Sequence, residues 1–285
     1  MYNYSFIIPH KNSPDLLQRC VDSIPERDDV QVIVVDDNSD EGKKPALKER
    51  KNLQVILLDA SQSKGAGRAR NVGIKQAKGK WLLFADADDY YKKKVLDILD
   101  KYLNLDVDVI YFNFEFKDGN TGKILHSLNF QKYFKEYDGS KKACDQIKFH
   151  IKNPWTKMTS HAYIDKYQIN FEEVPNGNDI LFSMKVGYFT DSIYIEKTPL
   201  YVYLRNDNSI LTSKETVEAA LCRLVHLIKV NYFYSFIGYP EWRRSVTKRI
   251  LKKIISLKGP FFIAICRKSI QLINDRREWV KLFSA

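Results

Sequence analysis

Three carboxylates within four positions follow an apolar run that is typical of a buried strand. The run covers residues 80–84 and is followed by Asp86, Asp88 and Asp89. Carboxylates crowded at the end of a strand repel one another and lose part of their hydration, so a cation or a ligand hydroxyl usually compensates them. In an open α/β sheet, ligands bind at the carboxyl ends of the strands. The acidic run therefore predicts a binding site at such an edge.

One of these acids has a structural explanation. Aspartate is a favoured N-cap residue, and Asp89 precedes an expected helix over residues 90–103. Asp86 and Asp88 lack that explanation, so we assign them to function. Mg²⁺ and Mn²⁺ prefer oxygen ligands, so a carboxylate here can hold such a metal while a diphosphate supplies further oxygens. The metal would then neutralise a departing phosphate.

A second acidic pair, Asp36 and Asp37, follows an expected strand over residues 30–35. On the same sheet edge as Asp86, these carboxylates can accept hydrogen bonds from a nucleobase N–H or a ribose hydroxyl. An Asx turn or a cap explains the pair as well. Residues 64–73 combine small residues, which allow close backbone approach, with cations that suit phosphate. Their spacing matches neither a P-loop nor a dinucleotide-binding fingerprint.

The first 113 residues alternate strand-like and helix-like segments. Apolar, β-branched runs that predict strands cover residues 4–8, 30–35, 53–58, 81–84 and 107–112. Helix-like patterns between them cover residues 13–24, 43–51 and 66–77. Alternation of this kind predicts an α/β fold with a largely parallel sheet whose two faces are covered.

The pattern changes after residue 113 to short strands and helices. Residues 114–130 resemble a hairpin with a turn at residues 118–122. We expect residues 114–214 to cover the open edge of the sheet and to shape a second binding site. Beyond them, residues 215–285 are predicted to be helical. The chain is therefore divided into residues 1–113, residues 114–214 and a helical extension.

The composition is that of a globular protein. The chain has 285 residues, 44% of them hydrophobic, which is enough for a full core. Its 4 cysteines form no C-x-x-C pair, which disfavours a zinc or redox motif and fits a reducing compartment. No run approaches the roughly 18 to 20 apolar residues of a membrane span, and the first residues lack the pattern of a signal peptide. We therefore expect a cytoplasmic protein.

Positive charge is concentrated near the C-terminus. Residues 215–285 contain 14 Lys and Arg against 5 Asp and Glu, whereas residues 1–214 contain 32 against 30. Within residues 241–257, apolar side chains share one helical face and most basic ones lie opposite. A basic amphipathic helix with aromatic residues on its apolar face predicts peripheral binding to the inner face of a membrane. The alternative is a helix that packs on the body and exposes a charged face.

Four motifs, taken in order, resemble those of family 2 glycosyltransferases, which have the GT-A fold. They are residues 6–12 (FIIPHKN), 34–39 (VVDDNS), 69–73 (ARNVG) and 84–89 (FADADD). Weaker similarity follows at residues 154–157 and 177–182. The resemblance implies a Rossmann-like nucleotide-binding sheet, in which residues 1–113 bind the nucleotide-sugar and residues 114–214 bind the acceptor.

The resemblance also implies roles for individual residues. Contacts with the nucleoside and diphosphate of the donor would be made by Pro9, Asp36, Asp37, Lys64, Arg70 and Asp86. Asp88 would ligate the metal, and Trp155 would stack on an acceptor sugar. Asp179 would be the general base that takes a proton from the acceptor hydroxyl. Asn178 departs from the glutamate common in the family, and Asp191 is the alternative base.

These observations predict a metal-dependent, inverting glycosyltransferase of bacterial surface polysaccharide synthesis. It would move a sugar from a nucleotide donor, expected to be UDP-linked, to a glycan or lipid-linked glycan, with no nucleic acid partner. A noncatalytic polyanion-binding protein would explain the basic extension but not Asp86 and Asp88, which repel phosphate without a metal. A metal-dependent nucleotidyltransferase, which also uses acids at strand ends, is the enzymatic rival.

Overall fold

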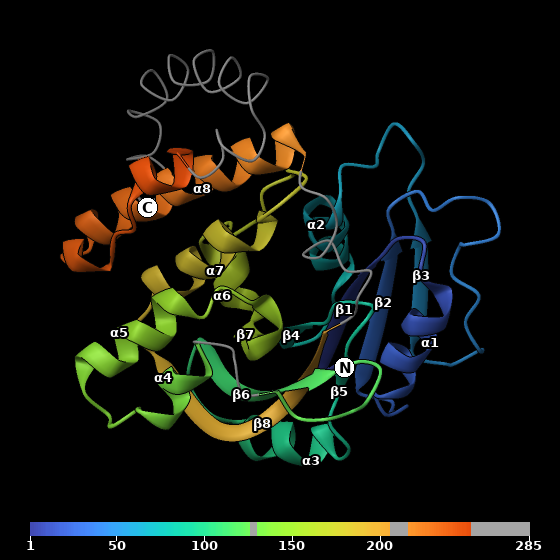
Figure 1. Ribbon diagram of the computed structural model, residues 1–285. Helices are drawn as coiled ribbons and strands as arrows, with labels where there is room; N and C mark the ends of the chain where they lie inside the picture. The colour runs from blue at the N-terminus through green and yellow to red at the C-terminus, as the bar shows by residue number, and fades with distance from the viewer. Residues whose placement is uncertain (126–129, 206–215, 252–285) are drawn as a thin grey trace.

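The computed structural model describes residues 1–125, 130–205 and 216–251 (Figure 1). Within them, one sheet of 8 strands runs in the order β3-β2-β1-β4-β7-β6-β8-β5. The strands from β3 to β4 are parallel, β7 is antiparallel to both of its neighbours, and β6 and β8 are again parallel. The α/β class is confirmed, whereas the sheet is mixed rather than largely parallel.

The parallel part of the sheet consists of β1 (Tyr4–His10), β2 (Val30–Asp36), β3 (Leu53–Leu57) and β4 (Trp81–Phe84). Three of these strands are buried along their whole length, which explains why their sequences are continuous apolar runs. β3 forms the edge and is only half-buried. All four strands confirm predictions made from the sequence.

Two predicted helices connect these strands. α1 (Pro14–Asp22) has proline in its first turn and buries Leu17, Cys20 and Val21. α2 (Ala66–Gln76) packs on β1 and β2. Gly73 permits this close approach, because a Cβ there would lie 2.4 Å from Ile7 Cγ2.

The helix predicted over residues 43–51 is not formed. Polar groups of this stretch bond to α1 and the residues after it. Lys48 N–H donates to a glutamine side chain of α1. Arg50 donates to the carbonyl oxygens of Val21 and Ile24 at 2.5 and 2.7 Å. These contacts hold the segment against the end of α1 and satisfy carbonyls that a helix end leaves open.

The segment after the acidic run also differs from the prediction. The expected helix over residues 90–103 is replaced by β5 (Tyr90–Tyr91), α3 (Val95–Leu99) and a 3-10 turn, η1 (Asp100–Tyr102). Asp89 is therefore not a helix cap. It is fully buried and accepts hydrogen bonds from the Tyr201 hydroxyl at 3.0 Å and Leu204 N–H at 2.8 Å. Its carboxylate ties a later strand to the end of β4.

That later strand belongs to a portion that extends the sheet, not one that covers its edge. β6 (Val109–Asp118), β7 (Lys157–Ser160) and β8 (Ile193–Arg205) continue the sheet beyond β4. Figure 1 shows β6 and β8 curving together beneath the helices. The predicted turn at residues 118–122 exists. Within the described residues, the chain after it returns to β6 through a bridge between Lys117 and Ile124 and a hydrogen bond from Leu125 N–H to the Phe116 carbonyl oxygen.

Helices cover one side of this extension. They are α4 (Gln131–Lys135), α5 (Lys141–His150), η2 (Pro154–Thr156), α6 (His161–Lys166) and α7 (Asn178–Tyr188). α7 matters most for the site, because its first turn faces α2.

The C-terminal part begins with α8 (Val217–Phe236), followed by η3 (Pro240–Trp242). Phe149, Leu181, Met184 and Phe233 form a second core that joins α8 to α5 and α7. Of the helix predicted over residues 241–257, residues 246–251 are helical, and the rest beyond residue 251 lies outside the described residues. None of the helices in the described ranges is long and apolar enough to cross a membrane.

Candidate functional site

The strand order creates a switch point between β1 and β4. The chain leaves β1 for β2 and β3 on one side and returns to β4 on the other. Ligands of open α/β sheets bind in the crevice outside the carboxyl ends of strands at such a point. The residues at these ends include Pro9, Asp36, Asp37, Asp86 and Asp88. The fold thus brings these five predicted site residues to one sheet edge.

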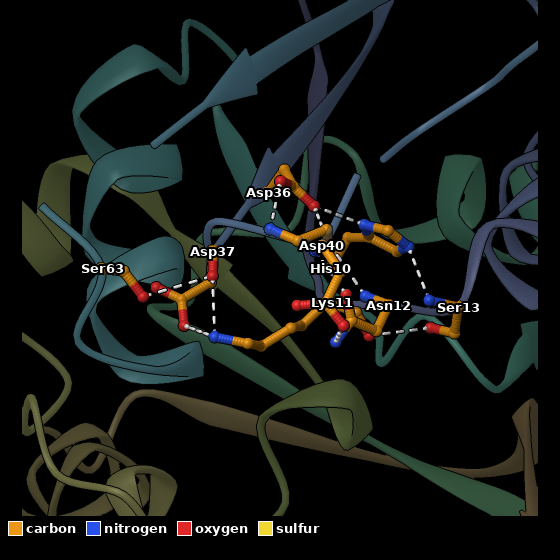
Figure 2. Close-up of polar contacts among 9 residues, drawn as sticks. His10, Lys11, Asn12, Ser13, Asp36, Asp37, Asp40 and Ser63 are labelled. Carbon is orange, nitrogen blue, oxygen red and sulfur yellow. Dashed lines mark hydrogen bonds and ion pairs between the residues drawn. The ribbon is translucent and has the colours of Figure 1, made fainter. Parts of the chain in front are cut away.

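Asp36 organises the loops at this edge (Figure 2). It is 1% exposed, and its Oδ1 accepts from His10 Nδ1 at 2.6 Å and from the Ser39 hydroxyl at 2.5 Å. His10 Nε2 accepts from Ser13 N–H at 3.1 Å, so the imidazole carries its proton on Nδ1 and is neutral. The Asp36 carboxylate is thus occupied by the protein, which favours the loop-forming role over direct contact with a nucleoside.

Asp37 holds the loop that leads into α2. Its carboxylate accepts from the N–H groups of Lys64 and Gly65 at 3.1 and 3.0 Å. Lys11 Nζ lies 3.6 Å from the same carboxylate, and Figure 2 shows this side chain reaching across to Asp37. Lys64 Nζ pairs with Glu173 at 3.5 Å. The interactions of Asp37 and Lys64 within the protein therefore position the loop from which both residues are predicted to contact the donor.

Arg70 connects the two halves of the site. From α2, its guanidinium donates to Asp86 Oδ1 at 2.5 Å and to Asn178 Oδ1 at 2.7 Å. Arg70 is buried, and the Phe171 ring lies 5.3 Å below its guanidinium carbon. Two acceptors and a ring fix the orientation of this cation. Asn178, which departs from the family glutamate, serves as the acceptor that joins α7 to α2.

Asp88 lies half-buried beside Asp86 on the loop after β4. Burial, and then the charges of Asp88 and Asp86, raise the pKa of buried Asp89 well above its usual range. The loop therefore concentrates negative charge. Within the described residues, no group of three or more His, Cys, Asp or Glu side chains is arranged to hold a metal ion.

The residues present nevertheless fit a hard cation that takes part of its ligands from a diphosphate. The acidic loop carries carboxylate oxygens, the ligand type that Mg²⁺ and Mn²⁺ prefer, and Asp88 would be the one to hold the metal. Mg²⁺ is commonly held by one or two carboxylates together with phosphate oxygens and water. One carboxylate of the acidic loop, completed by a diphosphate and water, matches that mode of binding.

Asp179 lies in the first turn of α7, one residue after Asn178. Burial raises the pKa of its carboxyl, the Arg70 charge opposes this shift, and the Asp86 charge adds to it. A carboxylate whose pKa is raised is a stronger base than an ordinary aspartate. The preceding Gly177 has φ +73°, a backbone conformation in which a side chain is strained. Gly177 is the N-cap of α7, so this turn places Asp179 in the first turn of the helix.

The small residues of the 64–73 segment serve close packing of the protein on itself. A Cβ on Gly67 would lie 2.1 Å from the carbonyl oxygen of Glu172, so α2 must approach the loop before α7 at this point. Asn71 exchanges two hydrogen bonds with the backbone of Phe171, at 2.8 and 3.0 Å. The sequence suggested close approach to a ligand, whereas the glycine at position 67 meets another segment of the chain.

Trp155 is in the core, not on the surface of the site. Its side chain is 2% exposed and stacks on Tyr201 and Tyr203 with ring centroids 4.7 and 5.5 Å away. Phe114 packs edge-on against the same indole. A ring this buried has no open face for a sugar, so the predicted stacking on an acceptor is not supported.

Asp191 is far from the acidic run. It follows the C-terminal end of α7, whereas Asp179 begins that helix, and 11 helical residues span roughly 16 Å. Its side chain is 96% exposed and pairs with Lys148 at 2.7 Å. The geometry therefore favours Asp179 over Asp191 as the base.

Sequence reasoning missed two residues that support the site. The Tyr201 hydroxyl accepts from Asp86 N–H at 2.9 Å while it donates to Asp89. Lys157 is 1% exposed and donates to the carbonyl oxygens of Ile151 and Asn153 at 2.8 and 2.7 Å. Burial lowers its pKa to about 7, and the charge of Asp179 opposes that shift. Lys157 lies in a segment with family resemblance, but only the contacts of the two residues reveal these roles.

Comparisons with known proteins identify the family that this arrangement matches. The profile of "Glycosyl transferase family 2" matches residues 5–168. Among curated proteins, "Putative glycosyltransferase EpsH" of Bacillus subtilis is 24% identical over 216 residues, covering 73% of this chain and 62% of that protein. "Poly(ribitol-phosphate) beta-N-acetylglucosaminyltransferase TarS" of Staphylococcus aureus is 28% identical over 215 residues, covering 71% of this chain and 35% of that protein.

The fold has a counterpart among solved structures. Residues 1–349 of S. aureus TarS, crystallised in complex with UDP-GlcNAc, superimpose with a TM-score of 0.63 at 22% identity, covering 99% of this chain and 82% of that chain. The likeness shows that the two share the fold. The chain spans less than two thirds of the length of the two curated relatives.

Proposed function

The chain belongs to glycosyl transferase family 2, and from this membership and the site geometry we propose that it transfers a sugar from a UDP-sugar to a glycan or lipid-linked glycan of a bacterial surface polymer. The curated relatives support the class of product, since TarS is described as acting on poly(ribitol-phosphate). The TarS structure, which holds UDP-GlcNAc, supports the choice of a UDP-sugar as the donor. Family membership disfavours a noncatalytic polyanion-binding protein.

The observation that carries the proposal is the bridge made by Arg70. It brings the loop with Asp86 and Asp88 to the same place as the first turn of α7 with Asp179. A nucleotide-sugar needs both groups, because its diphosphate must be held on one side of the anomeric carbon while a base activates the acceptor on the other. Residues that are distant in sequence thus form one site.

Each side chain then has a role in an inverting displacement. The Asp179 carboxylate takes the proton of an acceptor hydroxyl as that oxygen bonds to the anomeric carbon. The bond from the anomeric carbon to the phosphate oxygen breaks, and the nucleoside diphosphate leaves with the electron pair. Asp86, oriented by Arg70, binds near the ribose, and Asp88 would hold Mg²⁺ or Mn²⁺, which when bound would stabilise the leaving diphosphate.

The test is metal-dependent binding of UDP by calorimetry. We expect Mn²⁺ to tighten UDP binding to the wild type at least tenfold, and Asp88→Asn to abolish that gain. Asp97→Asn removes an exposed acid from α3, nine positions along the chain, and should behave as the wild type. If Mn²⁺ does not change the affinity for UDP, or if both variants lose the same affinity, Asp88 is not a metal ligand.

A second measurement separates the transferase from the nucleotidyltransferase rival. A transferase incubated with a UDP-sugar releases UDP, slowly when the sugar passes to water and rapidly when it passes to an acceptor. A nucleotidyltransferase would instead consume a nucleoside triphosphate and release pyrophosphate. Turnover of UTP without turnover of any UDP-sugar would favour the rival.

Peripheral attachment to the cytoplasmic face of a membrane remains part of the proposal. Its support is the excess of basic residues within residues 215–285. Anionic liposomes should bind the full chain and release it as ionic strength rises, because surface charges are screened within about 8 to 10 Å at moderate salt. If the chain does not bind at low salt, the alternative holds, in which the C-terminal helices pack on the rest of the protein. α8 already packs in this way on α5 and α7.

A further inference from the structure

A cavity of about 430 Å³ lies where α7, α8 and the segment after η3 meet. Its lining residues are Lys152, Gly177, Ile180, Arg223, His226, Leu227, Val230, Arg244, Ser245, Lys248 and Arg249. A cavity of this size is in the range that holds small organic ligands. None of these residues belongs to the donor site described above.

Among the described residues, the charged side chains that line the cavity have one sign. Five of its lining side chains are Lys or Arg, and no acidic side chain from the described residues lines it. Glu172, which bonds to lining residue His226 at 2.9 Å, also pairs with Lys229 at 2.7 Å. Cations gathered around one cavity repel one another unless an anion compensates them. Arg and Lys together are the usual protein ligands of phosphate.

The cavity also has an apolar part. Ile180 of α7 and Leu227 and Val230 of α8 contribute aliphatic side chains to its lining. An inorganic ion alone would gain nothing from these contacts, whereas an organic phosphate would bury carbon atoms against them. The mixed lining therefore suits a phosphate group attached to an organic moiety.

The cavity adjoins the catalytic end of α7. Gly177 lines it and stands two residues before Asp179. Lys152 also lines it; burial and the Arg244 charge lower its pKa to about 7, and Asp179 opposes that shift. The base thus lies within electrostatic reach of a cavity cation. A ligand in the cavity would reach Asp179 from the side of α8. The acidic run lies on the other side of Arg70, which bonds to both Asp86 and Asn178.

We propose that this cavity binds a phosphate group of the acceptor. The proposal rests on the transferase function above and identifies the acceptor as a phosphate-bearing molecule. The cations hold the phosphate while the aliphatic residues contact the adjoining carbon chain. The acceptor hydroxyl then reaches Asp179 from a molecule that is already anchored, which lowers the entropic cost of the attack.

Calorimetry on the full chain with saturating UDP tests the site, using inorganic pyrophosphate as the probe. UDP occupies the donor site, so further binding reports the cavity. The double variant Arg244→Gln, Lys248→Gln should weaken pyrophosphate binding at least tenfold. The main chain of Arg244 is held on both sides by the Asn231 amide, at 2.7 and 2.9 Å, so these exposed side chains can be replaced without releasing the segment.

Arg243→Gln is the matched control, because Arg243 is an exposed neighbour of Arg244 that does not line the cavity. It should bind pyrophosphate within twofold of the wild type. The proposal is overturned if the wild type does not bind pyrophosphate, or if the control loses as much affinity as the double variant. UDP binding is measured on the same samples: its absence from the wild type would contradict the transferase function itself, whereas UDP binding without pyrophosphate binding would contradict only the cavity assignment.

A second probe distinguishes two sources of the phosphate. Geranyl diphosphate carries a short prenyl chain, as a lipid-linked acceptor would. If it binds at least tenfold more tightly than pyrophosphate, the aliphatic lining contacts a lipid carrier. If the two bind equally, the cavity accepts the phosphate of a water-soluble polymer. Either result supports a phosphate site, provided that the double variant weakens both.

Discussion

The Arg70 guanidinium donates to Asn178 Oδ1 at 2.7 Å across 108 positions of sequence. The same guanidinium donates to Asp86. α2 therefore aligns the helix that carries Asp179 with the acidic loop. One buried cation, held by two partners, determines how the proposed donor and acceptor parts of the site meet.

Replacing this cation should separate the two parts. Arg70→Gln keeps a polar side chain but cannot reach both acceptors, which leaves the partly buried Asp86 carboxylate or the buried Asn178 amide without its partner at a cost of about 1 to 3 kcal/mol. We expect the free energy of unfolding to fall by that amount and turnover of the UDP-sugar to fall more than tenfold. Chemical denaturation and a UDP-release assay measure the two effects.

Arg68→Gln is the control for this variant. Arg68 lies two positions earlier on α2 and makes a more exposed ion pair with Glu173 at 3.3 Å. Surface pairs contribute little, about 0 to 1 kcal/mol. If Arg68→Gln and Arg70→Gln reduce turnover equally, the bridge has no special role.

Removal of the proposed base should reduce turnover without loss of the donor. Asp179→Asn retains the size of the side chain but cannot accept the acceptor proton, so we expect turnover to fall on the order of 10² to 10⁴-fold with UDP affinity unchanged. A variant that loses UDP affinity in the same proportion would point to a role in donor binding. Asp191→Asn, at the other end of α7, should retain wild-type turnover.

The pH dependence of turnover follows from the raised pKa of Asp179. The base acts only when ionised, so turnover should fall as pH decreases through that pKa, at higher pH than the value of about 3.9 for an ordinary aspartate. Arg70 lowers this pKa, so Arg70→Gln should shift the acidic limb to still higher pH. If the acidic limb of the pH profile is at the same pH in Arg70→Gln and in the wild type, a group other than Asp179 limits turnover at low pH.

The buried Asp36 carboxylate should contribute to stability through its three hydrogen bonds. Asp36→Asn substitutes an N–H₂ group for one acceptor, so the His10 ring or the Ser39 backbone loses its partner. We expect a loss of about 1 to 3 kcal/mol in the free energy of unfolding. Asp40→Asn alters an exposed acid of the same loop and should cost under about 0.5 kcal/mol. Equal losses in urea denaturation would argue against the network.

The Tyr201 hydroxyl should position the acidic loop. Tyr201→Phe removes both the acceptor of Asp86 N–H and a donor to Asp89, and we expect weaker Mn²⁺-dependent UDP binding together with a loss of about 1 to 3 kcal/mol in stability. Tyr203→Phe removes a hydroxyl from the same strand while keeping the stack on Trp155. Calorimetry should show donor binding unchanged in the Tyr203 variant.

Local patterns predicted much of the first 113 residues. The continuous apolar runs of β1, β2 and β4 follow from burial on both sheet faces, and the proline start of α1 is a property of a few adjacent residues. The helix predicted over residues 43–51 was wrong because Arg50 and Lys48 bond to α1, and contacts of that kind have no signature in a window of sequence.

The sequence by itself determined the family, the strands that end in acids and the order of the motifs, because these depend on neighbouring residues. Only the tertiary structure decided which acids support the fold and which face the crevice. The carboxylates of Asp36 and Asp89 accept hydrogen bonds from the protein itself, and Trp155 is buried against two tyrosines. Arg70 bonds to Asp86 and to Asn178, and so joins the acidic loop to the helix that carries Asp179. The physical reason is that hydrogen-bond partners and burial come from segments as far as 26 to 115 residues apart, which meet only when the sheet has formed.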